Sequence, residues 1–317
     1  MKKVIVLFFI LTSVSSSFGQ ELTIPAQTQY LADNPFSLSP VFAGIGDNAR
    51  IRVNGLAQWV GIKNAPINQS LVGDIRITDN DGVGLMVYND KNGNTRQSGI
   101  KLAFAHHIIL DYVSEQYLSF GISYNFNQFR VDFENFNAYD PTITSDRYTR
   151  NNNFDLGILY RNKDFYFSLN ASNILNKNIE EFAKAEPSTL RNFQIYTGQK
   201  FRTSGSDFEL EPSILYQYFQ SDKRSTTDLN LKLKWFNFDD YYWAGITARF
   251  LNEQSFAPVT VGPMLGLRVK DFYFGYSYQI NTNNLLPYNN GTHMITLGYD
   301  FLQGLSNCPC TKTRIVD

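Results

Sequence analysis

Leu118-Ser-Phe-Gly-Ile-Ser-Tyr-Asn-Phe-Asn-Gln128 is the stretch of sequence that decides the fold. Its large apolar residues alternate with small or polar ones, so that Phe120 and Ile122 face away from Gly121. A repeat of two residues predicts a β-strand with two unlike faces. A single strand of this kind also fits a soluble sandwich, so the number of copies decides between the two classes.

Similar segments follow one another from residue 50 to residue 301, and each has a length of about ten residues, as in outer-membrane barrels. Their apolar faces are rich in aromatic residues, in a chain with 26 Phe and 19 Tyr. We therefore predict an all-β fold, a transmembrane antiparallel β-barrel of outer-membrane type with about 14 strands within residues 49–301. The predicted strands are 50–58, 69–77, 82–88, 100–110, 117–128, 153–161, 164–173, 191–201, 208–218, 228–235, 242–251, 258–269, 271–281 and 292–301.

The connections between these segments alternate in length. They are short after the even-numbered strands, as at 162–163, and mostly long after the odd-numbered strands, as at 89–99, 129–152 and 174–190. Short periplasmic turns and long outer loops are typical of bacterial outer-membrane barrels. Because the strand number is even, we expect both termini in the periplasm, with residues 302–317 as a periplasmic tail.

The first nineteen residues have the features of a secretory signal peptide. Lys2 and Lys3 precede the apolar run 4–11, and small residues lie near a cleavage point after Gly19. The apolar run is shorter than the about 20 residues that a membrane-spanning helix needs. We therefore predict export of the chain. Its net charge of −1 offers no basic excess for binding nucleic acid.

The segment 20–48 departs from the alternating pattern. It contains Asn34-Pro-Phe-Ser-Leu-Ser-Pro40, whose two prolines are incompatible with a central strand. We expect an ordered, extended segment at the periplasmic mouth or inside the barrel. A simple linker into the first strand, a plug and a binding site for a partner all fit this pattern.

Charged residues are expected on the inner face of several strands. Glu209 and Glu211 face inward on one strand, and Lys232 and Lys234 face inward on the next. Opposite charges on neighbouring strands stabilise a polar interior. A structural ladder of ion pairs and a conducting pore both fit this arrangement.

The sequence contains no recognisable catalytic or metal-binding motif. His106 and His107 are adjacent on one strand and so face opposite ways, and His293 lies near the outer rim. No nucleophile elbow or HExxH motif accompanies them. We predict a non-enzymatic protein without cofactor or metal. Cys308 and Cys310 are interpreted as two accessible thiols, or as a link to another molecule, in preference to a redox or metal motif.

Several motifs resemble the PorP/SprF family of the type IX secretion system in Bacteroidetes. They are Asn34-Pro35, Pro40-Val-Phe-Ala-Gly44 and, above all, Gln58-Trp-Val-Gly-Ile-Lys-Asn-Ala-Pro66. Further similarity occurs at Gly82-Val-Gly-Leu85, Tyr88-Asn-Asp-Lys-Asn-Gly93, Ala103-Phe-Ala-His-His107, Leu118-Ser-Phe-Gly121 and Thr292-His-Met-Ile295, so it extends over nearly the whole chain after the signal peptide. Val41-Phe42 stands where the family usually has Ala-Tyr, and Met294 where Glu is common, which indicates a divergent member.

The resemblance implies a non-enzymatic outer-membrane component of the secretion and gliding machinery. Its partners would be type IX secretion components, outer-membrane lipid, and a large secreted surface adhesin bound through its C-terminal domain. The candidate partner-binding residues are Gln58, Trp59, Gly61, Ala65, Pro66, Asn34 and Pro35. Trp59 equally fits an aromatic girdle at the membrane surface. An outer-membrane porin or hydrophobic-substrate transporter of the same architecture is the alternative function.

Overall fold

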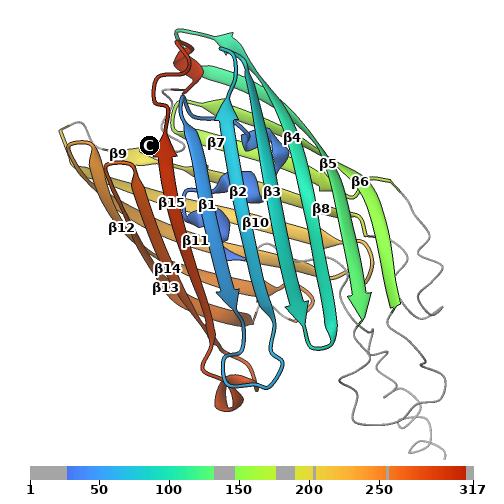
Figure 1. Ribbon diagram of the computed structural model, residues 1–317. Helices are drawn as coiled ribbons and strands as arrows, with labels where there is room; N and C mark the ends of the chain where they lie inside the picture. Colours follow the sequence, from blue (N-terminus) through green and yellow to red (C-terminus); the bar gives the residue numbers. More distant parts are fainter. Residues whose placement is uncertain (1–26, 132–146, 176–189, 203–204, 255–256, 312–317) are drawn as a thin grey trace, which may run out of the picture.

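The computed structural model describes residues 27–131, 147–175, 190–202, 205–254 and 257–311 and shows a closed antiparallel β-barrel (Figure 1). Each strand pairs with its neighbours in the sequence, and β15 pairs with β1 to close the ring. The segment β9 continues β8 beyond Lys200, so the fifteen segments form fourteen strands. They are β1 (Ala49–Ala57), β2 (Ile67–Arg76), β3 (Asp81–Asn92), β4 (Thr95–Asp111), β5 (Gln116–Val131), β6 (Arg147–Asn162), β7 (Phe165–Ser172), β8 (Asn192–Gln199), β9 (Phe201–Arg202), β10 (Phe208–Phe219), β11 (Ser225–Asn237), β12 (Asp240–Leu251), β13 (Pro258–Val269), β14 (Phe272–Asn281) and β15 (Thr292–Phe301).

The predicted barrel and its fourteen strands are confirmed, and one predicted loop is wrong. Residues 89–99 were expected to form a long connection. Instead β3 and β4 continue as a paired ladder up to Asn92 opposite Thr95, with only Gly93-Asn94 between them. The apolar alternation stops here although the strands do not, because strand residues beyond the hydrocarbon layer can be polar on both faces.

The two faces of the wall differ as the alternation predicts. On β5 the side chains of Phe120 and Ile122 are each 44% exposed on the outside, whereas Ser119 and Ser123 inside are buried. Large apolar residues cover the outer surface on the other strands too, for example Leu231 on β11 and Leu297 on β15. An apolar outer band suits a lipid environment and leaves the polar residues for the interior.

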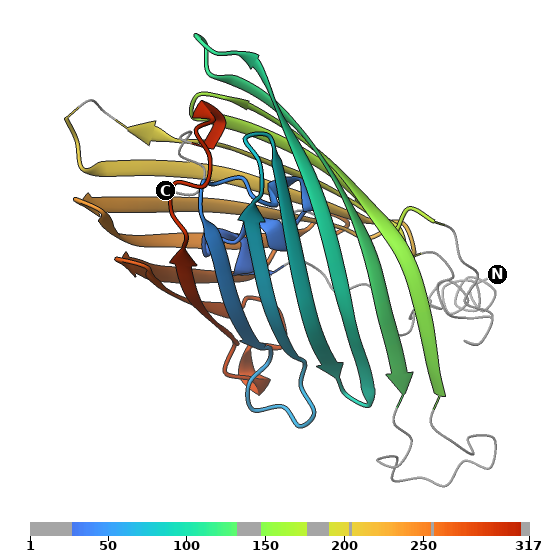
Figure 2. The ribbon, with the colours of Figure 1, turned by 45° about the horizontal axis from the view of Figure 1, so that its top comes forward.

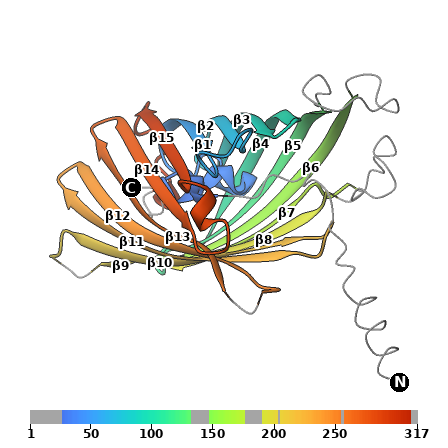
Figure 3. The ribbon, with the colours of Figure 1, turned by 90° about the horizontal axis from the view of Figure 1, so that it is seen from below.

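Residues 27–48, which we call the lumen segment, lie inside the barrel (Figure 3). They form three short 3-10 helices, η1 (Thr28–Leu31), η2 (Pro35–Ser37) and η3 (Pro40–Phe42). Proline has no backbone N–H to donate to a sheet, and the segment lacks the alternating pattern. These residues therefore do not join the sheet. Val41 and Phe42 are completely buried, so the segment forms the centre of the hydrophobic core.

The two rims of the barrel differ. One carries the short turns, for example Lys163-Asp164 between β6 and β7, and the other carries the longer connections, such as 58–66 and 282–291 (Figures 1 and 2). We call them the short-turn rim and the long-loop rim. Ala49 pairs with Phe301 at the short-turn rim, so the barrel begins and ends at the same side.

The chain ahead of β1 runs back through the lumen. Gln27, its first described residue, accepts a hydrogen bond from Arg249, which lies close to the long-loop end of β12. The even strand number fixes the ends of the barrel but not the course of the segment before it. The predicted signal peptide, residues 1–19, lies outside the described residues.

The tail after β15 packs on the short-turn rim. The Leu305 N–H donates to the Asp47 carbonyl at 2.8 Å, and the Ser306 hydroxyl donates to Asp79 at 2.9 Å. Cys308 is disulfide-bonded and buried against Tyr117, so the interpretation of two accessible thiols is wrong. Within the described residues, no helix is long and apolar enough to cross a membrane.

Candidate functional site

Asp33 anchors the lumen segment to the barrel wall. Its carboxylate lies 2.7 Å from the Lys232 ammonium and 3.6 Å from that of Lys234, and it accepts a hydrogen bond from the Tyr241 hydroxyl. The Lys232 ammonium also donates to the Leu31 carbonyl at 3.0 Å. Asp33 is 6% exposed, and a buried carboxylate is stable only when it is paired and hydrogen-bonded. This cluster therefore holds the segment in one place.

A second attachment holds the end of the segment that leads into β1. Asp74 on β2 accepts from the Gly44 N–H at 2.9 Å and pairs with Arg50 at 2.6 Å. Arg76 donates to the Gly44 carbonyl at 2.7 Å. These contacts satisfy both backbone groups of Gly44 with charged partners, which form the stronger class of hydrogen bond.

Glycines on the inner wall make room for the backbone of the segment. A Cβ atom at Gly121 would lie 2.3 Å from the Val41 nitrogen, so only glycine fits here. Gly44 has φ +60, and a Cβ there would lie 2.6 Å from the Cα of Gly82 on β3. The wall and the segment therefore touch backbone to backbone, an approach that a side chain would prevent.

The expected inward charges are present, but the lysines do not form ion pairs with the glutamates across the two strands. Glu209 lies opposite Lys234 and Glu211 opposite Lys232 in the β10–β11 register, as predicted. Both lysines reach Asp33, while Glu211 accepts from the Tyr166 hydroxyl at 2.8 Å. The two lysines thus bind the lumen segment to the wall, while Glu209 lies 3.7 Å from Lys200 on the wall itself.

A cavity of about 330 Å³ lies between the lumen segment and the long-loop rim, and we call it the vestibule. Trp59 and Pro66 of the β1–β2 loop line it, together with Gln27 of the lumen segment. The loop is closed by the Gln58 N–H, which donates to the Pro66 carbonyl at 2.9 Å. It also pairs with the β14–β15 loop, because the Val60 N–H donates to the Gly291 carbonyl at 2.9 Å. The vestibule therefore has a wall of ordered backbone.

The structure divides the predicted partner-binding residues into two groups. Gln58, Trp59 and Pro66 line the vestibule, and Gly61 and Ala65 belong to the same loop. Asn34 and Pro35 lie instead in the lumen segment, where both are buried. The Asn34 carbonyl accepts from the Ser37 N–H and hydroxyl, which closes the turn at η2. These two residues shape the segment and do not reach the loop.

The three histidine side chains do not share a site. His106 faces outward and contacts Asp81 at 2.7 Å, while His107 is buried between the Ser119 hydroxyl and the Ala43 carbonyl. His293 contacts the Tyr276 hydroxyl at 2.7 Å. Among the residues that the structure describes, no group of three His, Cys, Asp or Glu side chains could hold a metal ion.

Sequence reasoning missed Asp33 as the anchor of the segment. The inward lysines Lys232 and Lys234 were predicted to pair with Glu209 and Glu211 on the neighbouring strand. A usable signal was present, because Asp33 is the one acid between Glu21 and Asp47 in the sequence. A single acid in an otherwise uncharged segment before a barrel is a candidate partner for inward lysines.

A closed barrel with an apolar outer band, a polar wall and an internal segment defines this chain as an outer-membrane β-barrel protein. The chain belongs to the family described as "Type IX secretion system membrane protein PorP/SprF", whose sequence profile matches residues 19–299. No curated protein matches the chain.

Solved barrels resemble this one only distantly. The CymD monoaromatic hydrocarbon channel has 10% identity and a TM-score of 0.49, with 90% of this chain and 95% of that chain covered. Omp33 of Acinetobacter baumannii has 10% identity and a TM-score of 0.44, with 81% and 99% covered. BamA from Haemophilus ducreyi has 8% identity and a TM-score of 0.42, with 80% and 70% covered. Such distant similarity carries no information about what this barrel binds.

Proposed function

We propose that this barrel is a non-enzymatic part of the type IX machinery that binds a large secreted surface protein through its C-terminal domain and helps to export or retain it. The observation that carries the proposal is the anchoring of the lumen segment by Asp33. A segment held across the lumen by a buried ionic cluster suits a rigid support for a partner. It suits a general diffusion pore poorly, because such a pore needs a water-filled interior.

In this proposal the long-loop rim faces outward and the short-turn rim faces the periplasm. Bacterial outer-membrane barrels generally have short periplasmic turns and longer outer loops. The ends of the barrel at Ala49 and Phe301, and the tail up to Thr311, then lie in the periplasm. The tail would meet periplasmic components of the machinery there.

The vestibule is the proposed contact surface for the secreted protein. Trp59 and Gln58 line it at the outer rim, and Gly61 and Ala65 continue the same loop. Large aromatic side chains in partly desolvated pockets often contribute most to a protein interface. Asn34 and Pro35 would act indirectly by fixing the segment that forms the floor.

Deletion of the gene tests the proposal. We expect one large surface protein to disappear from the cell surface, and gliding to be impaired if that protein is an adhesin. The wild-type gene should restore display, Trp59→Ala should restore it poorly, and Tyr288→Ala should restore it fully. Tyr288 is a suitable control because it is 73% exposed on the neighbouring β14–β15 loop and does not line the vestibule. Normal display of every type IX substrate in the deletion strain would contradict the proposal.

A further inference from the structure

A second cavity, of about 140 Å³, lies between the lumen segment and the inner faces of β2 to β8. We call it the amide cavity because side-chain amides dominate its lining, among them Asn68, Gln97, Asn125, Asn127, Asn192 and Gln194. It adjoins the vestibule, since Gln29 and Asn68 line both. A cavity of about this size can hold one six-membered ring.

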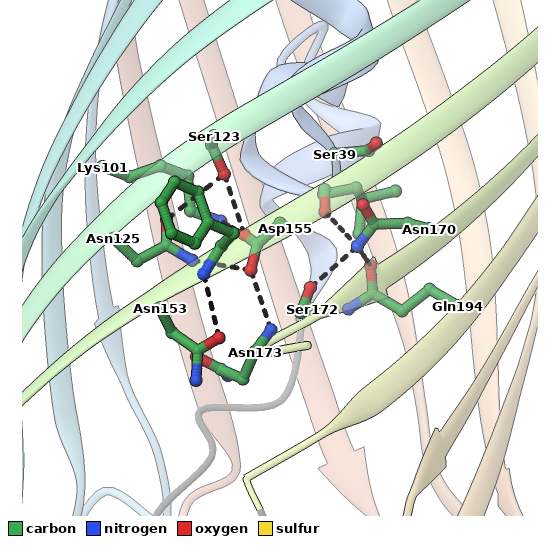
Figure 4. A network of polar contacts seen from close by, with 12 residues as sticks. Ser39, Lys101, Ser123, Asn125, Asn153, Asp155, Asn170, Ser172, Asn173 and Gln194 are labelled. Carbon is green, nitrogen blue, oxygen red and sulfur yellow. Dashed lines mark hydrogen bonds and ion pairs between the residues drawn. The ribbon is translucent and has the colours of Figure 1, made fainter. Parts of the chain in front are cut away.

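The charges in this lining neutralise each other. Asp155 is 1% exposed, and its carboxylate pairs with the Lys101 ammonium at 2.7 Å. The same carboxylate accepts from the Asn125 amide at 2.6 Å, the Ser123 hydroxyl at 3.1 Å and the Asn173 N–H at 3.0 Å (Figure 4). A carboxylate with four partners has little capacity left for a ligand. The cavity therefore offers neutral donors and acceptors.

One buried acceptor beside the cavity lacks a partner. The Asn170 amide nitrogen donates to the Ser172 hydroxyl at 2.8 Å and contacts Gln194 at 3.3 Å and the Leu38 carbonyl at 3.4 Å (Figure 4). Its Oδ1 atom is buried, and no described group bonds to it. A buried polar atom without a partner is costly, and the Asn170 amide that carries it bonds to Ser172 and Gln194, which line the cavity.

We propose that the amide cavity binds a neutral sugar at the end of a glycan. A sugar hydroxyl both donates and accepts, and a carboxamide offers a donor and an acceptor side by side, so the two match. Tyr88 and Met86 add apolar surface to the lining, against which the C–H face of a sugar ring can pack. The inference is independent of which protein the barrel binds.

A peptide suits the cavity less well. Recognition of an extended peptide commonly uses an unpaired sheet edge together with pockets for alternate side chains. The strands β2 to β8 around this cavity are all paired on both sides, and the lining carries few apolar residues. A hydroxyl-rich, uncharged ligand can instead donate to and accept from the amide side chains of the lining.

The test uses the full-length barrel, purified in a detergent without a sugar headgroup so that the detergent cannot occupy the cavity. The probes are an array of neutral oligosaccharides, an array of acidic oligosaccharides and a neutral Gly-Ser-Ala repeat peptide. Titration calorimetry then gives the affinity of the best neutral oligosaccharide. Two further probes distinguish the sources of such a sugar, namely glycans released from lipopolysaccharide and glycans released from secreted proteins.

We expect a neutral oligosaccharide to bind, with at least a tenfold loss of affinity in Gln194→Met and in Asn127→Leu. Gln279→Met is the matched control, because Gln279 faces inward on β14 but lies outside the lining, and it should stay within twofold of wild type. Two variants on different strands keep the test valid if one of them fails to fold. Absence of neutral sugar binding, preference for acidic glycans or the peptide, or an equal loss in the control would overturn the proposal.

Discussion

The carboxylate of Asp33 lies 2.7 Å from the ammonium of Lys232, although 199 positions separate the two residues in the chain. This contact joins the lumen segment to β11, which β7, β8 and β10 separate from the β5–β6 wall that receives Val41. The segment is therefore held by charged side chains at Asp33 and Gly44 and by backbone packing at Val41. A segment held in this way is part of the folded barrel.

Asp33→Asn should destabilise the folded barrel. The substitution leaves Lys232 and Lys234 buried without their carboxylate, and removal of one partner from a buried pair costs about 3–5 kcal/mol. Urea unfolding in detergent micelles measures the loss. Asp222→Asn is the control, because Asp222 pairs with Arg224 at 3.6 Å in a loop where both are about a third exposed. Such pairs contribute less than about 1 kcal/mol. Equal effects of the two substitutions would show that Asp33 is no anchor.

Gly121→Ala should also destabilise the barrel, because its new methyl group would overlap the Val41 nitrogen. Overpacking of this kind costs about 1–3 kcal/mol. The matched control is Gly55→Ala on β1, where no heavy atom lies within 4 Å of an added Cβ. The same unfolding assay compares the two. A wild-type midpoint for Gly121→Ala would mean that the segment does not rest on this glycine.

Single cysteines test which rim faces outward. Lys63→Cys lies in the β1–β2 loop and Asp239→Cys in the turn between β11 and β12, and both positions are exposed. A membrane-impermeant maleimide applied to intact cells should label the first and spare the second. Both should be labelled once the outer membrane is opened. Labelling of Asp239→Cys alone in intact cells would reverse the proposed orientation.

The purified barrel should not conduct ions steadily in a planar bilayer. The reason is that the lumen segment occupies the interior and is bound to the wall at Asp33 and Gly44. Asp33→Asn should increase the frequency of brief openings, because it weakens one of these attachments. A steady ohmic current through the wild-type protein would instead favour the alternative, a porin or a transporter for hydrophobic substrates.

The sequence was sufficient for the barrel but not for its interior. Alternation on β5 and its counterparts depends on each strand alone, so the strand number and the two faces could be predicted. The hairpin from β3 to β4 was missed because the apolar alternation ends at Asn89, whereas the ladder continues to Asn92. The contacts of Asp33 and Gly121 were also missed, since they join residues far apart in the chain. The isolated acid in an uncharged segment was a signal for Asp33, whereas spacing holds no information about the packing at Gly121.

The family resemblance and the loop motif indicated a partner-binding role for residues 58–66, and the structure adds a location. Trp59 lines the vestibule, so at least part of it faces the interior of the rim. Asn34 and Pro35 were grouped with that loop only because the same family motifs contain them. Their burial in the lumen segment indicates a structural contribution.

Affinity purification of the tagged barrel from native membranes, followed by quantitative mass spectrometry, tests the central claim most directly. The proposed function predicts that one large secreted surface protein and components of the type IX machinery co-purify with the barrel. It also predicts that Trp59→Ala reduces the recovery of the surface protein while Tyr288→Ala does not. Recovery of the barrel without any secreted surface protein would contradict the claim that it binds one.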